Sequence, residues 1–150
     1  MGRSILAAVV ILSSARAQNA PADKARVLSV SPGIDQEIFD HQRVRFDVQV
    51  HYSLASVDRA LMAVYVERYE NGPDGCDQVL KHNTEGGALT PIHRGDGNVM
   101  VHFDWHETNR HIPFGAAFLA IGINFWADYG GRPRKQLARF GTSFCRPVLP

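Results

Sequence analysis

The chain has 150 residues, with 16 Lys and Arg against 15 Asp and Glu, and a formal net charge of +1. A chain of this length fits one domain and leaves no room for a second. Its nearly balanced charge argues against a nucleic-acid-binding protein, because that class needs a concentrated basic surface.

The first 17 residues predict a secretory signal peptide. They contain an early cation, Arg3, then the apolar run 5–12, and end on the A-x-A sequence Ala15-Arg16-Ala17. The apolar run is too short to cross a bilayer as a helix, which needs about 20 residues. We therefore expect cleavage after Ala17, an exported protein in the periplasm or outside the cell, and no transmembrane segment in the mature chain.

Cleavage changes the charge and the start of the fold. Loss of Arg3 and Arg16 leaves 14 basic residues (16 − 2) against 15 acidic ones, so the net charge becomes −1. Residues 18–25 are polar and lack periodicity, which predicts a disordered leader. A single domain is then expected over residues 26–150.

The clearest structural signal follows in residues 44–54, where apolar and polar residues alternate. A period of two over this length predicts a half-buried strand. Residues 60–69 are rich in β-branched and aromatic side chains and favour another strand, although a short helix over 60–64 is the alternative. Alternation returns over 99–105, directly after Gly95-Asp96-Gly97-Asn98, which predicts a tight hairpin turn.

The last third of the chain predicts a central strand and a turn. Residues 116–127 are apolar on both faces up to Asn124, as in a strand covered on both sides, and Tyr129-Gly130-Gly131 then favours a turn. The paired glycines Gly86 and Gly87 are interpreted in the same way, as loop residues that adopt positive φ. Three shorter strands are expected at 27–30, 89–93 and 137–145.

About seven strands with no long amphipathic helix predict an all-β fold, an antiparallel β-sandwich. The opening Val30-Ser31-Pro32-Gly33 and the strands over 43–50 and 61–66 resemble an immunoglobulin-like or fibronectin-III-like domain of exported bacterial proteins. The resemblance is one of pattern, covers most of residues 26–146, and implies a non-enzymatic binding module. The chain differs from antibody domains in three ways: it has no Trp in the strand over 60–69, no cysteines in the two strands that a disulfide usually joins, and no tyrosine corner.

The two cysteines, Cys76 and Cys145, both survive cleavage. In an exported protein such a pair predicts a disulfide, which here would pin a long loop to the last strand. Two unpaired thiols are the alternative.

Aromatic residues supply the candidate binding surface. If Leu119 and its alternate neighbours face the core, four aromatic side chains lie on the outer face of their strands. These candidates for binding an unknown protein or carbohydrate partner are Tyr65, Tyr69, Phe118 and Trp126. We nevertheless favour the interpretation that the segment 71–87 folds over this face and covers it, and the exposed face is the alternative.

A metal site in the region His102–His111 is the competing functional hypothesis. His102 and His106 would lie about 13 Å apart along an extended strand, too far to share an ion. The candidate ligands are therefore His106, Glu107 and His111.

No catalytic or cofactor motif is evident, so the sequence predicts neither an enzyme nor a bound cofactor. The one basic cluster, Arg132, Arg134, Lys135 and Arg139, is interpreted as a solvated turn and strand edge.

Overall fold

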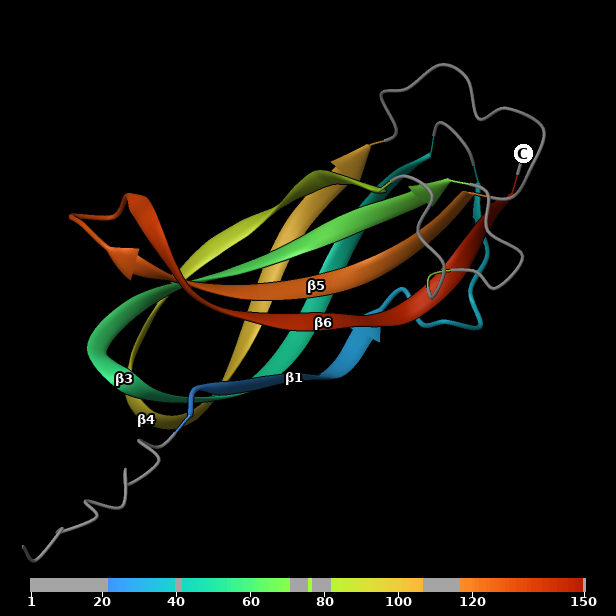
Figure 1. Cartoon of the computed structure of the whole chain (residues 1–150). Helices are drawn as coiled ribbons and strands as arrows, with labels where there is room; N and C mark the ends of the chain where they lie inside the picture. The colour runs from blue at the N-terminus through green and yellow to red at the C-terminus, as the bar shows by residue number, and fades with distance from the viewer. Residues whose placement is uncertain (1–21, 40–41, 71–75, 77–81, 107–116, 150) are drawn as a thin grey trace, which may run out of the picture.

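The computed structural model describes residues 22–39, 42–70, 76, 82–106 and 117–149. Within these residues the protein is all-β, with no helix (Figure 1). The strands are β1 (Lys24–Ser31), β2 (Ile38–Phe39), β3 (Arg43–Glu70), β4 (His82–His106), β5 (Ala117–Asp128) and β6 (Pro133–Leu149). They form one six-stranded sheet in the order β1-β3-β5-β6-β2, and β4 also pairs with β3.

The long strand β3 organises the sheet. Its first half pairs antiparallel with β1 and with the end of β4, whereas its second half pairs with the start of β4 and with β5. The register between β3 and β4 shifts between Leu54 and Arg59. Figure 1 shows both strands turning back on themselves there, so that the sheet doubles over into two layers.

The core lies between these layers and follows from the alternation seen in the sequence. Val44, Phe46, Val48 and Val50 from the first half of β3 are buried, and the intervening Arg45 is exposed. They join one apolar cluster with the inward residues of the second half of β3 and of β5, which include Met62, Val64, Val66, Ile121, Ile123 and Phe125. The strands expected over 44–54, 60–69 and 116–127 are thus confirmed with their inward faces, the last of them from Ala117 onward.

The expected hairpin turn at residues 95–98 is wrong. These residues lie inside β4 and pair in register with residues 51–54 of β3. Gly95 has a φ of 114°. This glycine therefore bends the continuous strand β4 instead of reversing the chain direction in a hairpin. The strands expected at 89–93 and 99–105 are consequently parts of one strand.

The bend in β3 is held by the side chains of Asp23, just before β1, and of Arg94 in β4. The Asp23 carboxylate accepts hydrogen bonds from the amides of Ala55 and Ser56, at 2.8 and 2.9 Å, and from the Ser56 hydroxyl at 2.6 Å. Arg94 donates to the Ala55 carbonyl at 2.7 Å. Asp23 lies just before β1, which begins at Lys24, so the last residues of the expected leader 18–25 belong to the fold.

Burial raises the pKa of Asp23, but the bonds from Ser56 and Ala55 outweigh it, and the net pKa is lowered. The carboxylate is therefore the form that holds the bend.

At the other end of the molecule, β6 holds the connection between β1 and β2. Arg146 is buried, and its guanidinium donates hydrogen bonds to the carbonyls of Pro32, Gly33 and Gln36. The same group lies over the Phe46 ring, with Cζ 5.8 Å from the ring centroid. A buried cation thus satisfies loop carbonyls that strand pairing leaves unused.

Candidate functional site

The candidate site lies on the outer face of the layer formed by β5, the second half of β3 and the start of β4. Inward residues of β3 and β5 fill the core, so their alternate neighbours face away from it. In register across the sheet, Tyr65 faces Gly122 and Gly87, and Ala63 faces Asn124 and Leu89.

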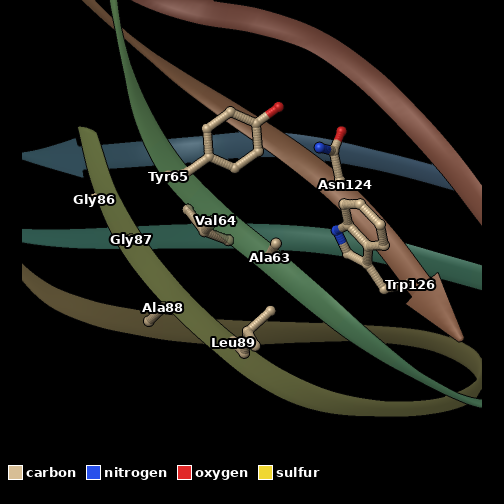
Figure 2. Close-up of a pocket in the computed structure, with 9 residues that line it drawn as sticks. All are labelled: Ala63, Val64, Tyr65, Gly86, Gly87, Ala88, Leu89, Asn124 and Trp126. Carbon is tan, nitrogen blue, oxygen red and sulfur yellow. The ribbon is translucent and has the colours of Figure 1, made fainter. Parts of the chain in front are cut away.

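A hollow of about 360 Å³ opens on this face. Figure 2 shows it between Tyr65, Leu89 and Trp126, which come from three different strands. The residues between them are small, so that the sheet surface is bare there; they are Ala63, Gly86, Gly87 and Ala88. Leu89 is 47% exposed, and Trp126 is partly exposed. We call this hollow the β3–β5 groove.

Two glycines shape the groove. A Cβ atom on Gly122 would lie 2.5 Å from the Tyr65 ring, so Gly122 gives the ring room to lie flat on β5. A Cβ atom on Gly87 would lie 2.3 Å from the Val64 carbonyl oxygen, so this position accepts no side chain. Gly86 and Gly87 were expected in a loop with positive φ; that expectation is wrong, because both lie in β4 and neither has positive φ.

Next to the groove lies a buried polar cluster centred on Glu67, whose side chain is only 3% exposed. The Tyr69 hydroxyl donates to one carboxylate oxygen at 2.7 Å, and Arg139 donates to the other at 3.1 Å. The Tyr69 hydroxyl also lies 3.2 Å from the Thr142 hydroxyl. Pairing and hydrogen bonding therefore compensate the burial of this carboxylate.

Burial raises the pKa of both tyrosine hydroxyls in this region, Tyr65 and Tyr69. The negative charge of Glu67 raises the pKa of both further. Both phenols are accordingly neutral donors near neutral pH.

The four predicted binding residues separate into two groups. Tyr65 and Trp126 line the β3–β5 groove, whereas Tyr69 and Phe118 pair with each other further along β3 and β5. Tyr65 and Tyr69 are 6% and 5% exposed, so neither presents an exposed ring to a partner. The hydroxyls of both tyrosines bond to Glu67 in the polar cluster. Phe118 and Trp126 keep partial exposure.

The predicted disulfide is confirmed. Cys76 and Cys145 are bonded, with 5.8 Å between their Cα atoms. The Cys76 sulfur lies 3.9 Å from the Leu119 carbonyl oxygen, so the bond holds Cys76 against β5 and β6. Residues 71–75 and 77–81, most of the segment proposed as a cover, lie outside the described residues.

The proposed metal ligands are tested only in part. His106 is exposed at the end of β4, opposite Arg43, whereas Glu107 and His111 fall outside the described residues. In the part of the chain that the structure describes, no three His, Cys, Asp or Glu side chains are grouped to hold a metal. His102 instead pairs with Asp47, Nδ1 to Oδ1 at 2.5 Å, and this bond lowers the pKa of Asp47.

Among the described residues, no helix has the length and apolar character needed to cross a membrane. Comparisons of the chain with protein-family models, with curated proteins and with solved structures found no match. Sequence reasoning missed Leu89 as a groove residue, because it was assigned to a separate short strand. In one continuous strand alongside β3, Leu89 and Pro91 lie on the same face, and this period of two would have placed Leu89 on the outer face.

Proposed function

We propose that this protein is an exported, non-enzymatic binding module whose ligand site is the β3–β5 groove. The observation that carries the proposal is the hollow of about 360 Å³ with an exposed Leu89 and a partly exposed Trp126 at its sides. Binding sites of soluble proteins are concave and mostly apolar, with a few polar groups that orient the ligand. Asn124 supplies such a group at the edge of this groove.

The proposed fold is an immunoglobulin-like sandwich of seven strands. Division of β3 and β4 at their bends supports this count, since each then contributes one strand to each layer, which gives seven strands in addition to the two-residue β2 beside β6. One layer would hold β1, the start of β3 and the end of β4; the other would hold the start of β4, the end of β3, β5 and β6. The loops at the ends of such sandwiches commonly bind ligands, whereas the groove proposed here lies on an outer face.

The proposed partner is a protein or a carbohydrate. An indole beside a bare, uncharged surface can stack on a sugar ring or pack on an apolar side chain. Export is supported by the disulfide, which persists in oxidising compartments, and by the signal-like sequence over residues 1–17.

The test uses the mature protein as bait on a glycan array and in an extract of the cell envelope. Leu89→Asp places a charge in the groove, and Met100→Asp is the matched control, because both side chains are 47% exposed. Met100 lies on the other half of β4, facing Gln49. We expect Leu89→Asp and Trp126→Ala to lose a partner that Met100→Asp retains. Equal capture by all the variants would refute the groove as the binding site.

A further inference from the structure

The hairpin that joins β5 to β6 carries a concentration of positive charge. Figure 1 shows it standing clear of the rest of the sheet, at the end where β3 and β4 bend. Between Asp128 and Gln136 the chain reads Tyr-Gly-Gly-Arg-Pro-Arg-Lys. Arg132, Arg134 and Lys135 are all exposed, and Tyr129 is 57% exposed. We call these four residues the hairpin tip.

The turn beneath these side chains is firmly held. The side chain of Asp128 is only 3% exposed. It accepts a hydrogen bond from the Gly131 amide at 2.6 Å and forms an ion pair with Arg59 at 2.5 Å. The Tyr129 amide donates to the Arg132 carbonyl at 3.1 Å. Gly130 and Gly131 have φ of 65° and 82°, which allows the tight turn. The hairpin tip is thus presented on a preorganised support.

Two buried carboxylates near this hairpin already have partners inside the fold. Asp128 pairs with Arg59, and Glu67 pairs with Arg139, the fourth cation of this stretch of sequence. Within the described residues, no carboxylate forms an ion pair with Arg132, Arg134 or Lys135. Among the described residues, these three cations therefore have no counter-charge. They concentrate positive charge on a mature chain whose other residues, 11 basic (14 − 3) against 15 acidic, have a net charge of −4.

The shape of the hairpin tip selects among anionic partners. A projecting turn cannot enclose a small anion, but it can touch a flat array of negative charges with several cations at once. Tyr129 adds an amphipathic ring of the kind that settles at a membrane interface. Arg134 lies against this ring, with Cζ 5.8 Å from its centroid, so a cation and an aromatic group are presented together.

We propose that the hairpin tip is a docking surface for a bilayer that contains anionic phospholipids. The contact is peripheral and electrostatic, and it leaves the β3–β5 groove free, since the two surfaces share no residue. Three cations and one ring give weak, reversible binding that falls with added salt.

The test is co-sedimentation of the mature, disulfide-bonded protein with vesicles of phosphatidylcholine, with and without phosphatidylglycerol. The tip variant is Arg132→Gln/Arg134→Gln/Lys135→Gln. The control variant, Lys24→Gln/Arg26→Gln/Arg43→Gln, removes the same charge from exposed cations of β1 and β3. We expect the wild type and the control to bind vesicles that contain phosphatidylglycerol, and the tip variant to bind roughly 100-fold more weakly.

Further variants keep the test decisive if the triple substitution disturbs folding. Arg132→Gln alone should weaken binding roughly fivefold, and Tyr129→Ala should weaken it at high salt as well as at low salt. Equal losses in the tip and control variants would overturn the proposal, because net charge alone would then govern binding. Failure of the wild type to bind phosphatidylglycerol vesicles would also overturn it, including the outcome in which the hairpin tip binds only heparin, a soluble polyanion.

Discussion

Glu67 is a buried, paired carboxylate whose removal should clearly destabilise the protein. Glu67→Ala removes the partner of both the Tyr69 hydroxyl and Arg139 in a buried setting. Because Arg139 is 53% exposed and keeps some hydration, we expect the free energy of unfolding to fall by about 2–3 kcal/mol, below the cost of breaking a fully buried pair. Urea denaturation measures this loss.

Asp58→Ala is the matched control for this prediction. Asp58 also pairs with an arginine, Arg94, at 2.7 Å, but its side chain is 92% exposed. An exposed ion pair contributes less than about 1 kcal/mol. If Glu67→Ala and Asp58→Ala lowered stability equally, burial of the Glu67 cluster would have no energetic consequence.

The same cluster shows what a sequence conveys about single residues. Alternation correctly assigns Tyr65 and Tyr69 to the outward side of β3, because facing is a local property of a strand. Their burial depends on Gly122 and Thr142, which lie far along the chain and come alongside only in the folded sheet. No local pattern carries that information.

At the scale of elements, the bend in β4 should depend on the backbone freedom of Gly95. No atom lies within 4 Å of a Cβ built on Gly95, but its φ of 114° is strained for any other residue. We therefore expect Gly95→Ala to lower the free energy of unfolding by about 1–2 kcal/mol through backbone strain alone. Thermal and urea unfolding measure the change.

Gly141→Ala in β6 is the matched control, because it adds the same methyl group at a glycine without positive φ. A Cβ on Gly141 also meets open space, and its φ lies outside the positive region. We expect this variant to match or slightly exceed the stability of the wild type. A similar loss in both variants would show that strand glycines matter here for a reason other than φ.

The same bend marks the limit of element prediction. Residues 95–98 have the composition of a hairpin turn, yet they pair in register with residues 51–54 of β3. Long-range pairing along β3 outweighs the local turn preference, and only Gly95 retains a turn-like backbone. Alternation therefore predicted that these residues form strands and which face is buried. It did not predict that two of the expected strands are one continuous strand.

At the scale of the whole molecule, the architecture joins residues that are remote in sequence through a few connections. The all-β class followed from the number of alternating segments and the absence of helical periodicity. The groove was not predictable as a unit, since it needs Tyr65, Leu89 and Trp126 on three strands in one register. The disulfide was predictable because it needed only the cysteine count and the signal-like N-terminus.

That disulfide should supply a large share of the stability of the molecule. It closes a loop of 69 residues, for which chain entropy gives about 4 kcal/mol, against a typical total of about 5–15 kcal/mol. We expect Cys76→Ser/Cys145→Ser to lose about this amount in urea unfolding, and reductant to bring the wild type to the same stability. The double variant, which has no bond to break, should not respond to reductant. Equal stability of the oxidised wild type and the double variant would contradict the prediction. It would also contradict the inference that this fold needs an oxidising compartment to reach its full stability.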